Sequence, residues 1–155
     1  MKISMKINGV NRSFEVAPDE YLIDTLRKNG YLGVKQGCDT GTCGVCTIHM
    51  DGKAVLSCVV LSCRADGHEI TTIEGVQNEA EIIGRYLVDE GVEQCGYCSP
   101  GTIMSILYLE KCIKNPSDEE ILHYMNGNLC RCSGYTGQIR AIRRYLEEKY
   151  NEGCK

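Results

Sequence analysis

Two pairs of closely spaced cysteines in the second half of the chain constrain its fold more than any other feature. Cys95 and Cys98 form a Cys-x2-Cys pair, and Cys130 and Cys132 form a Cys-x-Cys pair. We call these four residues the downstream set. Side chains two positions apart on an α-helix do not face each other, so Cys130 and Cys132 are predicted to lie in a loop or at a helix end. Brought together by the intervening segment, the two pairs could hold zinc or an iron-sulfur cluster.

A second group of cysteines, the upstream set, lies in a glycine-rich segment. Cys38, Cys43 and Cys46 have the Cys-x4-Cys-x2-Cys spacing of plant-type [2Fe-2S] ferredoxins, and Cys58 completes the set. Glycines recur through residues 33–44 and permit the positive φ angles that a backbone needs to fold tightly around an inorganic centre. Zinc ribbons use two short cysteine pairs, so three ligands in one loop favour a [2Fe-2S] cluster over zinc.

The composition favours metal ligation over disulfide bonds. The chain has 155 residues, 11 cysteines and a formal net charge of -4. Residues 1–5 lack the continuous apolar core of a secretory signal, and no apolar run approaches the roughly 18 residues of a membrane span. We therefore expect a cytoplasmic protein without a membrane span, whose cysteines stay reduced. The mild acidity argues against a nucleic-acid partner, since such domains are usually basic.

The first half of the chain has the pattern of a mixed sheet packed on one helix. Alternating segments at 2–8 and 11–17 meet at Asn8-Gly9, which predicts a β-hairpin. A short helix is predicted between Asp19, as N-cap, and Gly30. Further strands are predicted at residues 47–50, 54–56 and 69–73.

Helical signals replace strand signals after residue 75. Four helices are predicted, the first capped by Asn78, the second by Ser99 with Pro100 at its first position, the third by a capping box at Ser117, and the fourth beginning at Thr136. The change in pattern predicts a domain boundary between residues 76 and 77, with an α/β domain at 1–76 and a helical domain at 77–155.

The cysteine motifs resemble those of the small iron-sulfur subunit of the molybdenum hydroxylases, the xanthine dehydrogenase family. The resemblance is carried by residues 37–47, 94–101 and 127–135, in the family's order and spacing. It implies an α+β fold in which an N-terminal β-grasp, plant-type ferredoxin-like domain (1–76) precedes a C-terminal four-helix domain (77–155). Each domain would hold one [2Fe-2S] cluster.

Carried over residue by residue, the resemblance implies two ligand sets and a contact with the molybdenum cofactor. The upstream set would hold the cluster on the flavin side, and the downstream set the cluster nearer molybdenum. Gln94 and Cys132 would contact the pterin of that cofactor. Cys63, Cys112 and Cys154 match no ligand position. Cys63 and Cys112 are predicted to be small buried hydrophobic residues, and Cys154 to lie in a frayed tail.

The implied function is electron transfer inside a larger oxidoreductase complex, with no catalytic residue on this chain. A large molybdenum-pterin subunit would dock around Gln94 and Cys132, and a medium FAD-binding subunit on an exposed loop at 37–46. The assembly would be a hetero-oligomer, and a dimer of heterotrimers is one form it could take. Xanthine is the first expected substrate, with nicotinate, aldehydes, 4-hydroxybenzoyl-CoA and carbon monoxide as alternatives. The rival classes are a free-standing two-cluster ferredoxin and a zinc-stabilised interaction module.

Overall fold

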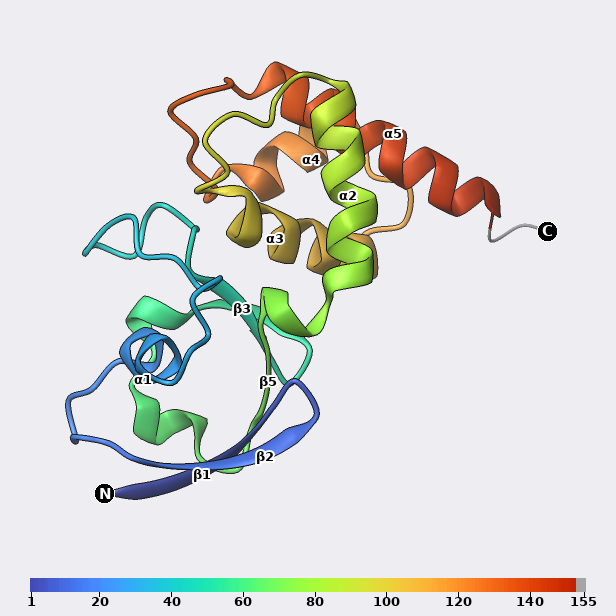
Figure 1. The fold of residues 1–155 in the computed structure, drawn as a ribbon. Coiled ribbons are helices and arrows are strands. Elements are labelled where there is room, and N and C mark those ends of the chain that lie inside the picture. The colour runs from blue at the N-terminus through green and yellow to red at the C-terminus, as the bar shows by residue number, and fades with distance from the viewer. Residues whose placement is uncertain (153–155) are drawn as a thin grey trace.

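The computed structural model describes residues 1–152 and shows an α+β fold, which confirms the predicted class (Figure 1). A mixed sheet and one helix form the first half, and four helices form the second. The strands are β1 (Lys2–Ile7), β2 (Val10–Glu15), β3 (Thr47–Met50), β4 (Lys53–Leu56) and β5 (Glu69–Thr71). The helices are α1 (Leu22–Lys28), α2 (Gln77–Asp89), α3 (Ser99–Cys112), α4 (Asp118–Met125) and α5 (Thr136–Glu152).

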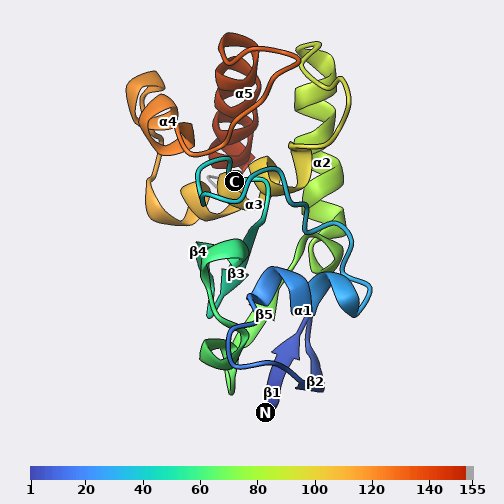
Figure 2. The ribbon, with the colours of Figure 1, turned by 90° about the vertical axis from the view of Figure 1, so that its left-hand side faces the viewer.

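The sheet has the strand order β2-β1-β5-β3-β4, in which only β1 and β5 run parallel. Alternate residues of β1, namely Ile3, Met5 and Ile7, are buried, as the period of two in the sequence requires. They share one hydrophobic core with Leu22 and Leu26 of α1. The helix therefore covers the apolar face of the hairpin (Figure 2).

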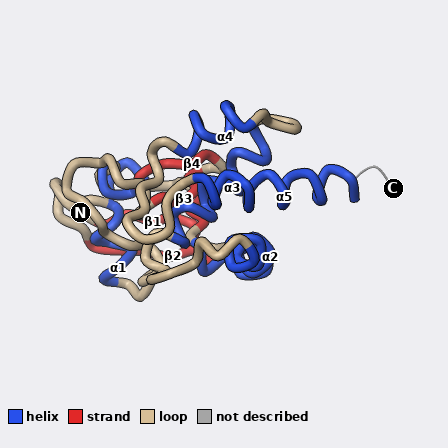
Figure 3. The backbone as a smooth tube through the Cα atoms, turned by 90° about the horizontal axis from the view of Figure 1, so that it is seen from above, coloured by secondary structure: helices blue, strands red, loops and turns tan. Residues whose placement is uncertain are grey.

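Helix α3 is the central element of the second half. It is apolar on every side and almost wholly buried from residue 101 to 109, as expected of a helix enclosed by other elements. It packs against β3 and β4 on one side and against α2 and α4 on the other (Figure 2). Helix α5 packs on α2 and α4 and extends away from the strands (Figure 3). No helix within residues 1–152 is both long and apolar enough to cross a membrane.

The two halves have separate hydrophobic cores. One core draws on residues between 3 and 70, and the other on residues between 83 and 146. Ile73 and Val76 pack against the second core although they precede α2. The division into domains at 1–76 and 77–155 stays a prediction that this distribution supports.

Three predicted helix starts are wrong because other contacts, one of them distant and two of them local, position the chain there. Tyr21, not Asp19, is the N-cap of α1, since Tyr21 is held extended by a bridge to Leu61. A 3-10 turn leads directly into α2, whose N-cap is Val76 rather than Asn78. The N-cap of α3 is the residue before Ser99, and the Ser99 hydroxyl instead donates to a glutamate. The capping box at Ser117 is confirmed, as is the start of α5 at Thr136.

His49 on β3 joins the sheet to α3. Its side chain is 3% exposed, and its Nε2 lies 2.8 Å from the carbonyl oxygen of Met104. Its ring also lies beside Tyr108, with 6.0 Å between the ring centroids. Burial lowers the pKa of His49 below its usual value, and the bond to the Met104 carbonyl only partly opposes that effect. The neutral ring is therefore the form that fits this interface.

Acid is expected to weaken the packing at His49. The unfolded chain takes up a proton near the ordinary histidine pKa of about 6.5, whereas the folded chain resists it to lower pH. The folded state then binds fewer protons, so the free energy of unfolding falls as the pH drops from about 7 to about 5.5. His49→Gln keeps a donor for the Met104 carbonyl but does not titrate. Thermal unfolding of both proteins at the two pH values should show the shallower dependence in His49→Gln, and equal dependence would contradict the prediction.

Candidate metal centres

The upstream set is assembled by the loop between α1 and β3 and by the 3-10 turn after β4. The thiols of Cys38 and Cys43 interact with each other, as do those of Cys46 and Cys58, and Coulomb interactions link the two pairs. Cys58 lies in the turn Ser57–Val59. The structure therefore brings all four predicted ligands of this set together, in two pairs.

Glycines shape this loop in two different ways. Gly41 and Gly44 have φ angles of +68° and +72°, which favour glycine. Gly37 has an ordinary φ, but a Cβ there would lie 2.9 Å from Val45 and 3.2 Å from the sulfur of Cys43. Both conformation and space constrain the first two positions, since a Cβ at Gly44 would also lie 2.2 Å from the carbonyl oxygen of Gly127, whereas space alone is the constraint at the third.

Backbone amides and burial shift the upstream thiols in opposite directions. The amides of Thr40 and Thr42 lower the pKa of Cys38 to about 5, and the Thr42 nitrogen lies 3.4 Å from the Cys38 sulfur. Burial raises the pKa of Cys43 and, together with the neighbouring Cys46, raises the pKa of Cys58 to about 12. A bound metal centre would supply the positive charge needed to ionise every thiol of such a group.

The downstream set is gathered from two loops. Cys95 and Cys98 lie between α2 and α3, and Cys130 and Cys132 lie between α4 and α5, which confirms the predicted loop placement. The sulfurs of Cys95 and Cys132 are 3.5 Å apart, and the Cys98 thiol interacts with that of Cys130. As in the upstream set, the four thiols meet in two pairs.

Polar groups surround the sulfur of Cys130. The hydroxyl of Ser133 lies 3.2 Å from it and the amide nitrogen of Cys132 lies 3.4 Å from it. Burial raises the pKa of Cys130, but the hydroxyl and amide of Ser133 and the amide of Cys132 outweigh burial and lower that pKa to about 7. Burial, with the neighbouring Cys130, raises the pKa of Cys98 to about 12. Hydrogen bonds aimed at sulfur are one way in which a protein tunes an iron-sulfur cluster.

The paired arrangement fits a [2Fe-2S] cluster, whose two irons each take two protein ligands. Within residues 1–152 no group of three or more His, Cys, Asp or Glu side chains is placed to hold one metal ion. The ten cysteines of this range all have free thiols. The donor sets, four thiols each with amide donors to sulfur, thus suit the predicted clusters.

Gln94 and Cys132 are both exposed beside the downstream set. The Gln94 amide nitrogen donates to the carbonyl oxygen of Gly91 at 3.3 Å, so its side chain is folded back onto its own loop. Both side chains can be reached from outside the chain. Their contact with a pterin stays a prediction.

Two predictions about exposure need correction. Cys112 is exposed rather than buried, because α3 leaves the core in its last turn, and Cys63 is only partly buried. Cys154 lies outside the described residues. The loop at 37–46 is exposed only in part, since residues 43–46 are buried: residues 43–45 lie against the second half of the chain and Cys46 joins the core of the first half.

Sequence reasoning missed several residues that support the downstream set. The hydroxyl of Tyr135 lies 3.2 Å from both the nitrogen and the carbonyl oxygen of Cys130. Glu93 accepts hydrogen bonds from the Ser99 hydroxyl at 2.8 and 2.9 Å. Gly101 was missed as well: a Cβ there would lie 2.3 Å from the carbonyl oxygen of Gly44 in the upstream loop, and an isolated glycine in a helical pattern is a signal of such packing.

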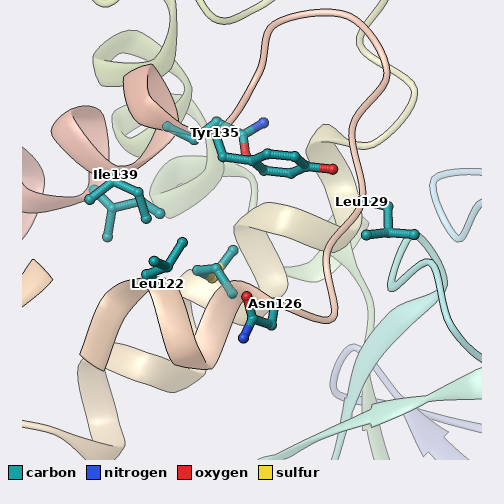
Figure 4. Close-up of a pocket in the computed structure, with 8 residues that line it drawn as sticks. Leu122, Asn126, Leu129, Tyr135 and Ile139 are labelled. Atoms are coloured by element: carbon teal, nitrogen blue, oxygen red, sulfur yellow. The ribbon is translucent and has the colours of Figure 1, made fainter. Parts of the chain in front are cut away.

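An apolar pocket of about 200 Å³ lies beside the downstream set, between α4 and α5 (Figure 4). Leu122, Leu129 and Tyr135 line it and are 50%, 45% and 43% exposed. Large apolar side chains gathered at one place on a surface mark contact sites for other proteins or ligands. We call these three residues the apolar rim.

Two segments of the chain match family models for iron-sulfur binding. Residues 5–70 match the model described as 2Fe-2S iron-sulfur cluster binding domain, and residues 72–143 match the [2Fe-2S] binding domain. The fold and the two cysteine sets therefore define a protein with two [2Fe-2S] clusters.

Relatives of known class match this chain over most of its length. It is 42% identical over 146 residues to a probable xanthine dehydrogenase subunit of Bacillus subtilis (strain 168), covering 93% of this chain and 84% of that protein. It is 40% identical to the nicotinate dehydrogenase small FeS subunit of Eubacterium barkeri, covering 95% of each. A chain of the crystal structure of quinoline 2-oxidoreductase from Pseudomonas putida 86 superimposes with a TM-score of 0.89 at 37% identity, covering 99% of this chain and 97% of that one. The chain belongs to the iron-sulfur subunits of the molybdenum hydroxylase family.

Proposed function

We propose that this chain is the electron-transfer subunit of a molybdenum hydroxylase complex and performs no bond chemistry itself. Electrons would enter from a molybdenum-pterin site on a large subunit and leave to FAD on a medium subunit or to another acceptor. The observation that carries the proposal is the presence of two four-thiol sets, each gathered in pairs with amide donors to sulfur, in a chain that matches iron-sulfur subunits along almost its whole length.

Each cysteine set would hold one cluster, and a [2Fe-2S] cluster accepts or gives one electron at a time. The chain's own residues position the sulfurs and stabilise negative charge on them: the Thr40 and Thr42 amides at Cys38, and the Ser133 hydroxyl at Cys130. The flavin-side ligands are Cys38, Cys43, Cys46 and Cys58, and the molybdenum-side ligands are Cys95, Cys98, Cys130 and Cys132.

The exposed groups beside each set support two docking faces. Cys132 and Gln94 are exposed beside the downstream set, and the apolar rim is exposed next to Cys130, so this side suits the large molybdenum-pterin subunit. In the loop at 37–46, residues 37, 39, 40 and 42 are exposed, so this segment suits the flavoprotein. We propose a hetero-oligomer with both partners, and a dimer of heterotrimers is one form it could take.

The substrate is bound by a partner chain, and we propose xanthine first. Relatives named for xanthine and nicotinate dehydrogenases match at nearly equal identity. Nicotinate, aldehydes, 4-hydroxybenzoyl-CoA and carbon monoxide are therefore tested beside xanthine. Substrate-driven bleaching of the clusters in the co-purified complex identifies the substrate, and bleaching by another compound alone would exclude xanthine.

Metal analysis joined to EPR of the dithionite-reduced protein tests the proposed function. Two [2Fe-2S] clusters require about four irons per chain and should give two distinct S = 1/2 signals. The complex is expected to co-purify with molybdenum- and flavin-containing chains at fixed stoichiometry. Zinc in place of iron would favour the interaction module, and a red protein that purifies alone with both signals would favour the free-standing ferredoxin.

A further inference from the structure

A carboxylate lies against the loop that carries the first two cysteines of the downstream set. Glu93 precedes Cys95 by two residues, and the hydroxyl of Ser99 donates to its carboxylate, with the two oxygens at 2.9 and 2.8 Å. A Cβ at Gly96 would lie 3.3 Å from one of these oxygens. Because Gly96 comes before Cys98 and Ser99 follows it, the carboxylate contacts the loop on both sides of a proposed cluster ligand.

No cation of the described chain pairs with this carboxylate. Within residues 1–152 Glu93 forms no ion pair, whereas Glu90, three residues earlier, pairs with Arg140 and Arg144 at 3.0 and 2.9 Å. Arg131 lies between two downstream ligands, but its side chain is exposed and does not pair with Glu93. Glu93 is only partly exposed, so water and salt screen its charge less than that of a fully exposed group. A negative charge without a partner therefore lies beside the downstream set.

The thiol of Cys98 responds to this charge. Burial and the neighbouring Cys130 raise the pKa of Cys98 to about 12, and the Glu93 carboxylate adds to the rise because it opposes a second negative charge nearby. A [2Fe-2S] cluster gains one negative charge when it is reduced, and net charge is one of the quantities that set its reduction potential. The repulsion that opposes a thiolate at this position would oppose reduction of a cluster there as well.

We propose that Glu93 lowers the reduction potential of the [2Fe-2S] cluster at the downstream set and so makes that cluster a stronger electron donor. The inference rests on the proposed function. In the step, the reduced downstream cluster gives one electron to the oxidised cluster at the upstream set. No bond forms or breaks and no proton moves. Glu93 is not a ligand and acts on the cluster through its charge.

Glu93→Gln tests the proposal, because glutamine removes the charge and keeps an oxygen that can accept from Ser99. A redox titration of the intact complex, followed by EPR, gives a separate potential for each cluster. Loss of one partly exposed charge should favour the reduced downstream cluster by roughly 3- to 10-fold. Tenfold in a one-electron equilibrium corresponds to about 59 mV. The potential of the downstream cluster should therefore rise, and that of the upstream cluster should change less.

Three further variants separate charge from contact. Glu79→Gln is the matched control, since Glu79 is an exposed glutamate in the first turn of α2, at the end of that helix away from the downstream loop. It should leave both potentials unchanged. Glu93→Asp keeps the charge and should stay closer to the wild type than Glu93→Gln does. Ser99→Ala breaks the same hydrogen bonds but leaves the carboxylate, so it should not raise the potential of the downstream cluster.

Three results would overturn the proposal. The first is an unchanged downstream potential in an iron-replete Glu93→Gln protein. The second is an equal rise in Glu93→Gln and Ser99→Ala, because the contact rather than the charge would then set the potential. The third is loss of the downstream cluster from Glu93→Gln, since Glu93 would then serve the structure of the loop.

The wild-type protein separates this inference from the proposed function. Fewer than two [2Fe-2S] clusters in the wild type would refute the proposed function itself. Two clusters in the wild type, with the same downstream potential in Glu93→Gln, would refute only the role of Glu93.

Discussion

Replacing Cys132 by alanine is expected to remove or alter one of the two EPR signals and to stop substrate-driven reduction of the flavin. Cys132 is exposed, and its sulfur lies 3.5 Å from that of Cys95. Loss of an outer partner of a metal ligand typically costs roughly 10- to 100-fold in metal affinity, so loss of a direct thiolate ligand should cost more. Iron should fall toward about two per chain, since the upstream set would keep its own cluster. Metal analysis, EPR and flavin bleaching in the purified complex measure these three effects.

Cys112→Ala is the matched control for Cys132→Ala. Cys112 is also an exposed cysteine, but it lies at the end of α3 and outside both sets. Its loss should leave both EPR signals and the reduction of the flavin unchanged. If Cys132→Ala keeps both signals and full turnover, Cys132 is neither a ligand nor a point of electron entry.

The sequence predicted most of the fold because its local signals agree with the tertiary structure. Asn8-Gly9 forms the turn between β1 and β2, with φ angles of 49° and 83°. The capping box at Ser117 provides hydrogen-bond acceptors for the backbone amides of Ser117 and Glu120 at the start of α4, and all of its groups lie within four residues. Signals of this kind act over a few residues and can be recognised without knowledge of packing.

Predictions of helix starts and of burial failed where contacts between segments distant in the sequence determine them. Tyr21 is held extended by Leu61, so α1 begins after it whatever the capping strength of Asp19. The burial of residues 43–45 depends on α3 and on residues 127–129, which belong to the other half of the chain. No local pattern encodes such a meeting of two loops.

The candidate site shows the same division between local and distant information. Spacing was sufficient to group the eight cysteines into two sets, since each motif is a local signature. It could not give the pairing of Cys95 with Cys132 or of Cys98 with Cys130, because that pairing depends on how two separate loops pack. The hydrogen bond between Leu129 and Cys43 joins two backbone groups, which every residue other than proline carries, so the residue types do not reveal it.

Removing the clusters is expected to expose thiols of very different reactivity toward a small disulfide reagent. The thiolate is the attacking form, and the best attacking thiol has a pKa near the ambient pH. At about pH 7, Cys130 and Cys38, with pKa values of about 7 and about 5, should react fastest. Cys58 and Cys98, whose pKa values burial raises to about 12, should react roughly 30- to 500-fold more slowly.

Lowering the pH to about 5.5 should select Cys38, because Cys130 is then mostly protonated while Cys38 remains mostly thiolate. Mass spectrometry of quenched samples gives the rate at each cysteine, and far-UV circular dichroism shows whether the cluster-free chain keeps its helices. Cys112, exposed and outside both sets, should react equally with and without clusters, whereas the set thiols should be protected when clusters are bound. Labelling of Cys58 or Cys98 as fast as Cys38 in the folded chain would contradict the prediction, since the amides at Cys38 would then fail to stabilise a negative sulfur.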